Sequence, residues 1–359
     1  QTASHELEQQ VKDEVLQSMK GSEHHLGRLK ARIAQSRQPW SSKCICEIMS
    51  EHVQIIANSA GIFLKLFPAL EQVEWFDDAS SEDLGNAFGQ LLVDLVCANG
   101  CFLSPSIKVL VRNFLHVPLY KSLTGRDASE LTVVGERLHR TLKSLLKMVP
   151  LGVQALLPAL VDRFPHKAVP LSKQEYFLCH ALYVCDYVPV VFSRILTLVV
   201  ERMILLDVEI KLADAFSDEE VSDTDEPVND DDDEGMFSMD EESPQKLSRR
   251  HHGTIASQPA HQGKERKRKA LMVDETAEKL DVVMNILLNF LETHFNEKHF
   301  EVLQRVFDDS IIRTHRSKYV QFLVFWACNK DPAFMAGFLQ RLVTMLMADN
   351  APMHLRRTC

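Results

Sequence analysis

The sequence has few of the residues that make tight turns, with 13 glycines and 14 prolines among 359 residues. Proteins built from β-strands need many such turns and use more glycine for them, so this composition favours an all-α fold. Long uninterrupted hydrophobic runs are also missing. The longest, from Val188 to Val200, is broken by Ser193, Arg194 and Thr197. That run is too short and too polar to span a bilayer, so we expect no membrane partner.

Paired cysteine motifs are absent as well. The 8 cysteines are scattered through apolar stretches and form no CxxC pair. This usage predicts reduced thiols in an intracellular protein and not a disulfide framework. The nearest approach to a metal site is the set Cys44, Cys46 and His52. It lacks a second pair of ligands, and on a helix Cys46 would point away from Cys44, so zinc is the less favoured interpretation.

Motifs that carry catalysis are missing too. The sequence contains no GxxxxGK[ST] or GxGxxG phosphate loop, no GxSxG nucleophile motif and no HExxH metal motif. His180 lies in an apolar helical stretch without an identifiable catalytic partner, which favours a hydrogen-bonded core histidine. Trp40 and Trp75 are expected to fill the core more readily than to serve as exposed anchors. We therefore expect a protein that is not an enzyme and holds no cofactor.

What the sequence does contain is helical periodicity. Apolar residues recur at intervals of three and four, the spacing of one helix face. Pro68 is expected to end the first clear run, and Asn99 with Gly100 to end the second. The predicted helices cover residues 45–67, 80–99, 105–115, 131–148, 151–164, 171–186, 190–210, 275–295, 297–308, 316–328 and 332–347.

Two of these segments look like copies of each other. Residues 149–163 and 188–202 both begin Val-Pro, continue with apolar residues and end with an acid followed by arginine, at a spacing of 39 residues. A period near this length, with proline opening the second helix of a pair, predicts a HEAT-type α-solenoid of stacked antiparallel helix pairs. The alternative is an irregular helical domain in which the two Val-Pro starts coincide by chance.

The net charge of -10 conceals a strong local asymmetry. Residues 214–243 carry 15 acids and no base, and residues 244–269 carry eight bases and one acid, which leaves about -2 for the rest of the chain. Such a stretch repels itself and has little to bury, so residues 214–273 are expected to form a disordered acidic and then basic loop. The loop would separate helical blocks at 44–213 and 274–348. Residues 1–43 would be a partly helical segment, and residues 349–359 a truncated end.

Several hydroxyl groups in this loop are candidate phosphorylation sites. Ser217, Ser222 and Thr224 precede acidic residues, as acidophilic kinases prefer, and Ser243 precedes a proline, as proline-directed kinases prefer. Each phosphate would add roughly -1.5 to -2 charges, so protein kinases are expected partners. Because patterns this short are common by chance, each site is a candidate only.

The basic run that follows is a candidate nuclear localisation signal. It consists of Lys264, Arg266, Lys267, Arg268 and Lys269. The alternative is a solvated run that merely balances the acidic stretch. Direct DNA binding is disfavoured, because no aromatic residues interleave with these bases and the rest of the chain is not basic.

Several segments, in this order and spacing, resemble the RNA polymerase I-specific transcription initiation factor family. They are residues 156–165, 175–185, 189–208, 235–242, 277–284 and 314–325, and the resemblance extends over about 44–347. It implies a HEAT-repeat fold and a non-enzymatic factor of the nucleus and nucleolus. Such a factor binds RNA polymerase I and bridges it to the promoter-bound core factor at ribosomal RNA genes. It also implies control by phosphorylation and a further C-terminal half.

This chain departs from the family pattern in one loop. Residues 122–130 lack the dense acidic and serine-rich run of vertebrate relatives. The phosphorylation sites of that loop are therefore not carried over to this chain. The alternative to the initiation factor is a generic nuclear HEAT-repeat adaptor in transport or ribosome biogenesis.

Overall fold

The computed structural model describes residues 2–35, 39–73, 75–76, 82–121, 130–221, 260–314 and 317–347. Regular structure in these ranges is helical, with one isolated strand-like bridge between Tyr120 and Leu131. The predicted all-α class is therefore confirmed. Within the same ranges, no helix combines the length and the apolar character needed to cross a membrane.

The N-terminal part forms a small group of helices around a common apolar centre. Val15 on one helix and Leu29 and Ile33 on the next are almost completely buried. The elements are α1 (Thr2–Met19), α2 (Glu23–Gln35), α3 (Pro39–Glu51), α4 (Val53–Asn58), α5 (Ala60–Phe63), η1 (Leu64–Leu66) and α6 (Phe67–Leu70).

The prediction of one continuous helix over 45–67 is wrong in detail. The backbone leaves helical geometry at His52 (φ -105°, ψ 17°) and again at Ser59 (φ -111°, ψ 32°), which divides the run into short helices. Pro68 does not end the run but lies in the first turn of α6. Proline is tolerated there because the first amide groups of a helix have no intrahelical partner to lose.

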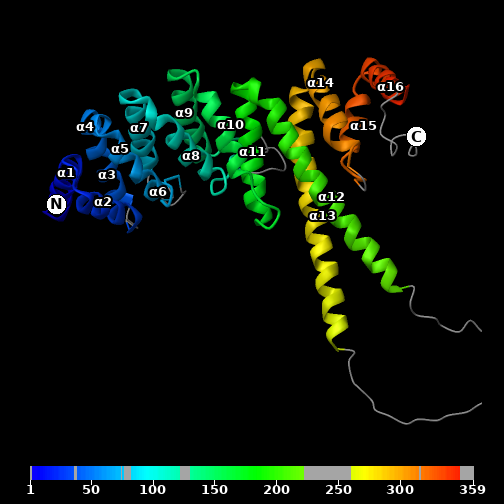
Figure 1. Ribbon diagram of the computed structural model, residues 1–359, viewed down its shortest axis with the longest axis horizontal. Helices are drawn as coiled ribbons and strands as arrows, with labels where there is room; N and C mark the ends of the chain where they lie inside the picture. Colours follow the sequence, from blue (N-terminus) through cyan, green and yellow to red (C-terminus); the bar gives the residue numbers. More distant parts are fainter. Residues whose placement is uncertain are drawn as a thin grey trace, which may run out of the picture.

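In the described part of the chain, five helix pairs follow, and they stack in a row (Figure 1). They are α7 (Glu82–Ala98) with α8 (Leu103–Asn113), α9 (Val133–Met148) with α10 (Gly152–Arg163), α11 (Leu171–Tyr187) with α12 (Phe192–Val221), α13 (Ala260–His294) with α14 (Glu297–Val306), and α15 (Phe322–Cys328) with α16 (Pro332–Met347). Short turns η2 (Gly100–Phe102), η3 (Pro189–Val191) and η4 (Phe307–Ile311) lie at helix junctions.

The two Val-Pro segments occupy equivalent places in this row. Pro150 lies in the turn between α9 and α10, and Pro189 opens the turn between α11 and α12. The 39-residue spacing thus corresponds to one helix pair, and the solenoid prediction is confirmed. Apolar side chains from successive pairs form one continuous buried cluster that extends from Val11 in α1 to Phe338 in α16. Stacking of this kind buries faces that no pair covers alone.

The predicted bounds of the charged loop, 214–273, are wrong at both ends. Helix α12 continues to Val221, and α13 already begins at Ala260, so both helices project beyond the stack (Figure 1). Extending a helix that packing already holds adds one hydrogen bond per residue without the cost of nucleation. The flanking segments are also rich in Ala, Glu, Lys, Arg and Leu, which are good helix formers. Residues 222–259 and 348–359 lie outside the described residues.

Candidate functional site

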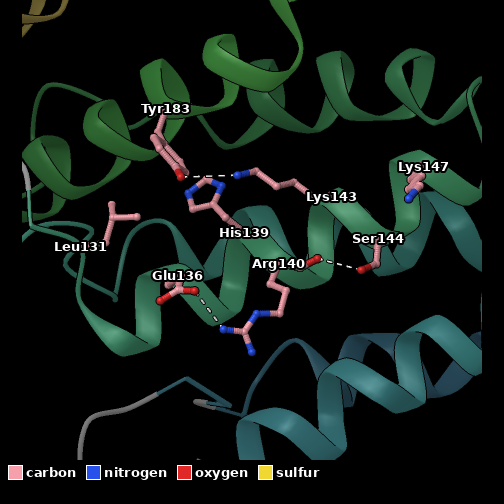
Figure 2. A pocket seen from close by; sticks show the side chains of 8 residues that line it. All are labelled: Leu131, Glu136, His139, Arg140, Lys143, Ser144, Lys147 and Tyr183. Atoms are coloured by element: carbon pink, nitrogen blue, oxygen red, sulfur yellow. Dashed lines mark hydrogen bonds and ion pairs between the residues drawn. The ribbon is translucent and has the colours of Figure 1, made fainter.

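A shallow groove lies between α9 and α11 in the described part of the chain. Its volume is about 370 Å³. Figure 2 shows that most of its lining comes from α9, with Tyr183 reaching in from α11. The lining residues are Leu131, Glu136, His139, Arg140, Lys143, Ser144, Lys147 and Tyr183.

Sequence spacing explains why α9 presents charge on one side. Glu136, Arg140, Lys143 and Lys147 recur at intervals of three and four and form one exposed stripe, while the leucines between them are buried. The helix starts at a defined residue because the Thr132 hydroxyl oxygen accepts a hydrogen bond from the Gly135 amide at 2.9 Å. We call Arg140, Lys143 and Lys147 the basic stripe.

Two of these cations are held by neighbours. The Arg140 guanidinium donates to the Glu136 carboxylate at 2.9 Å, one helical turn away. The Lys143 ammonium lies over the rings of Tyr183 and Tyr187, at 5.0 and 4.6 Å from their centroids. An ammonium above an aromatic face is attracted by the negative charge of that face, so the position of Lys143 is restricted.

A buried hydrogen-bonded chain lies beneath the groove. His139 Nδ1 is 2.8 Å from the Tyr187 hydroxyl, His139 Nε2 is 2.8 Å from His180 Nδ1, and His180 Nε2 is 2.8 Å from the Val117 carbonyl oxygen. A carbonyl only accepts, so His180 Nε2 carries a proton and its Nδ1 accepts from His139 Nε2. The Tyr187 hydroxyl then donates to His139 Nδ1. Every member of the chain is satisfied with both imidazoles neutral.

The surroundings of the two imidazoles favour this neutral state. Burial lowers the pKa of His180 to about 4. Burial, together with the nearby His180 and Lys143, holds the pKa of His139 well below its ordinary value. The expectation that His180 is a hydrogen-bonded core histidine is confirmed. Its role is to join α9, α11 and the segment before α9.

A second polar centre joins α12 to the start of α15. Asp207 is completely buried, and its Oδ2 accepts hydrogen bonds from the Ser317 hydroxyl at 2.7 Å and from the backbone amides of Lys318 (2.7 Å), Tyr319 (2.8 Å) and Val320 (3.3 Å). The first amides of a helical segment lack intrahelical acceptors. Asp207 therefore caps this segment from another helix.

A third polar centre holds the connection between α10 and α11. The Arg202 guanidinium donates to the Pro165 carbonyl oxygen at 2.5 Å and lies over the Phe164 ring. The Lys279 ammonium donates to the Lys167 carbonyl oxygen at 3.1 Å. Residues 156–165 and 189–208, two of the segments that carry the family resemblance, thus meet in space through Arg202 and Pro165.

The predicted modification and localisation residues are placed only in part. Ser217 lies in the last turns of α12, and the run from Lys264 to Lys269 lies near the start of α13. Ser222, Thr224 and Ser243 fall outside the described residues.

Among the described residues, the cysteines and the histidine of the zinc alternative do not form a ligand set. Cys44 and Cys46 are buried in α3, and burial raises the pKa of both thiols. His52 is committed through Nδ1 to the Ile48 carbonyl oxygen at 2.9 Å. In the part of the chain that the structure describes, no group of three or more His, Cys, Asp or Glu residues could hold a metal ion.

Trp75 is buried and stacks on Phe88, as expected for a core residue.

The basic stripe and Asp207 were not recognised from the sequence. The stripe could have been recognised in the sequence, because Arg140, Lys143 and Lys147 share the exposed face of a predicted helix. The role of Asp207 could not be predicted from the sequence, since its hydrogen-bond partners lie 110 to 113 positions away.

Comparisons with known proteins agree on one family. A sequence model described as "RNA polymerase I specific transcription initiation factor RRN3" matches residues 1–359. RNA polymerase I-specific transcription initiation factor RRN3 of Mus musculus is 26% identical over 312 residues, which are 82% of this chain and 45% of that protein. The corresponding factor of Schizosaccharomyces pombe is 25% identical over 293 residues, 77% of this chain and 45% of that protein.

The fold is similar to that of a solved structure. A crystal structure of RNA polymerase I transcription initiation factor Rrn3 covers 97% of this chain with a TM-score of 0.66 and 16% identity, and the chain covers 61% of it. The chain spans about half the length of the two relatives, 45% in each case. Because the family model matches the chain from end to end, this protein belongs to the RRN3 family of RNA polymerase I-specific transcription initiation factors.

Proposed function

We propose that this chain binds RNA polymerase I and bridges it to the promoter-bound core factor at ribosomal RNA genes. The observation that carries the proposal is the match to the initiation factor family along the whole chain. In this proposal the protein acts by binding and not by catalysis, because the family and the relatives that it matches are transcription initiation factors.

The architecture supports a bridging role. Stacked helix pairs give an elongated body with a single core, so surfaces on distant pairs keep a fixed separation. A large assembly such as a polymerase can then contact one part of the row while another factor contacts a different part. Flexible linkage between separate domains would not fix that geometry.

Regulation and import are assigned to the charged region. Ser217, Ser222, Thr224 and Ser243 are the proposed phosphorylation sites, used by protein kinases to change the charge of this region. The run from Lys264 to Lys269 is the proposed nuclear localisation signal, which would direct the factor to the nucleus and the nucleolus. Replacing its five bases with glutamine should leave a fluorescently tagged chain in the cytoplasm. Nuclear accumulation of that variant would reject the signal.

Affinity capture tests the proposed function. The tagged chain is incubated with nuclear extract, and the bound proteins are quantified by mass spectrometry. RNA polymerase I subunits should be the most enriched proteins, relative to a helical repeat protein of unrelated function carried through the same steps. Enrichment of transport receptors or ribosome-assembly factors without polymerase I would contradict it.

A further inference from the structure

We infer that the groove between α9 and α11 is a docking site for an acidic segment of a protein partner. The inference deepens the proposed function and rests on it in one respect, the assumption that the partner is a protein. The chemistry of the segment follows from the groove alone. The test uses peptides as the probe, so that a failure of the groove to bind acid and a failure of the chain to bind polymerase are separate results.

The groove offers cations and hydrogen-bond donors with little acid to oppose them. Its one carboxylate, Glu136, is already paired with Arg140. Among the described residues, no carboxylate forms an ion pair with Lys143 or Lys147. Burial raises the pKa of the Asp186 carboxyl, and the nearby His294 and Lys143 oppose that rise. The ion pair of Asp186, at 3.2 Å, is with His294 and not with Lys143. Two ammonium groups are therefore available to a ligand of negative charge.

Part of the binding site is organised before a ligand arrives. The Lys143 ammonium is held against two tyrosine rings and lies 3.4 Å from the Tyr183 hydroxyl oxygen. Tyr187 is fixed in turn by its hydrogen bond to the buried His139. Side chains that are already ordered lose less conformational entropy on binding, which favours affinity. The Tyr183 hydroxyl, which accepts from Lys143, still has its own proton to donate.

The spacing of the cations suits a peptide. Lys143 and Lys147 are four residues apart on α9, a rise of roughly 6 Å along the helix. Carboxylates two positions apart on an extended chain lie on the same side and are about 7 Å apart, close to this separation. Exposed apolar side chains lie at the two ends of α9, Val133 at the start and Met148 with Leu151 at the end. The surface therefore fits a segment in which acids are flanked by apolar residues.

A nucleic acid fits the groove less well. Phosphate backbones are bound by long basic surfaces or by bases stacked on exposed aromatic rings. Here the stripe has three cations, and the rings of Tyr183 and Tyr187 are covered by Lys143. The chain outside the charged region, at about -2, is not basic either. An acidic protein segment accounts for both the small number of cations and the apolar ends.

The test measures binding of a labelled peptide to the full chain by fluorescence anisotropy. The probe alternates Asp and Leu, and the control peptide carries Asn in place of Asp. We expect the acidic peptide alone to bind, and more weakly as salt rises. Lys147→Gln should weaken binding by about twofold to fivefold, and Lys143→Gln with Lys147→Gln by about tenfold, the range for exposed charge pairs. Lys143→Arg, which keeps the charge, should bind like the unmodified chain.

Matched controls separate the groove from general charge effects. Lys298→Gln removes another exposed cation, on α14, and should leave the affinity unchanged. Thermal unfolding of each variant checks that the fold is intact. The inference is overturned if the two lysine variants bind as tightly as the unmodified chain, if the Asn peptide binds equally well, or if single-stranded DNA displaces the acidic peptide at lower concentration.

Discussion

At the scale of single residues, the His139–His180 chain makes stability depend on pH. His180 has a folded pKa of about 4 against an ordinary value of 6.5. Between these values the unfolded chain binds a proton that the folded chain does not. The free energy of unfolding should therefore fall as pH drops from about 6.5 to about 4, by up to about 3 kcal/mol from this residue.

Denaturant unfolding of the unmodified chain and of His180→Gln tests this. Glutamine does not titrate, so the variant should lose less stability on acidification. The stability difference between the two proteins should narrow as the pH is lowered. Parallel losses in both proteins would show that His180 does not contribute.

Asp207 is the second residue with a specific consequence. Asp207→Asn removes the charge that attracts four donors and places an NH2 group in a fully buried site. We expect a loss of about 1.5–3 kcal/mol in the free energy of unfolding, the range for hydrogen bonds to charged groups. Glu201→Gln, at an exposed position of the same helix, is the control and should have little effect. Equal effects of the two substitutions would contradict the capping role.

The sequence predicted some of these residues and not others, for a physical reason. His180 could be assigned to the core because its own neighbours along the helix are apolar. Its partners, His139 and the Val117 carbonyl, lie 41 and 63 positions away. Contacts between residues so far apart in the sequence depend on how the helix pairs stack. The apolar periodicity within one helix does not predict that stacking.

At the scale of helices, periodicity predicted where most of them lie. Residues 151–164, 171–186 and 332–347 correspond closely to α10, α11 and α16. The errors occur where tertiary contacts decide the end of a helix. The helix expected from 316 begins at Phe322, because Asp207 holds the amides of the preceding turn. Helices α12 and α13 extend farther than predicted, because charged residues that favour a loop also favour helix once a helix is nucleated.

The repeat alignment makes a prediction about α10 and α12. Leu160 and Leu196 are almost completely buried in the continuous apolar core. Alanine at either position should cost about 2–5 kcal/mol, because it leaves a cavity in a packed core. Leu205→Ala is the matched control in α12, since this leucine is 57% exposed. Chemical denaturation measures all three, and tolerance of Leu196→Ala equal to that of Leu205→Ala would contradict the alignment.

At the scale of the whole molecule, α16, the last of the described helices, carries a stripe of exposed apolar side chains. Met335, Leu339 and Val343 are exposed at intervals of four residues, while Phe338 on the other side is buried. A helix that is apolar on both sides is usually covered by further structure. We predict that the chain associates weakly with itself through this stripe.

Sedimentation velocity over a range of protein concentrations measures this association. Leu339→Lys with Val343→Lys should shift the chain toward the monomer without lowering its melting temperature. The same substitutions at buried positions would unfold it, so the melting temperature is the internal check. Association unchanged by the two lysines would place the contact elsewhere.

The most direct measurement of the central claim is binding of the purified full chain to purified RNA polymerase I, with RNA polymerase II as the matched competitor. An immobilised chain and label-free detection give both affinities under one set of conditions. Belonging to the polymerase I-specific factors predicts that polymerase I binds and that an excess of polymerase II does not displace it. Equal binding of both polymerases, or binding of neither by a correctly folded chain, would contradict the proposed function.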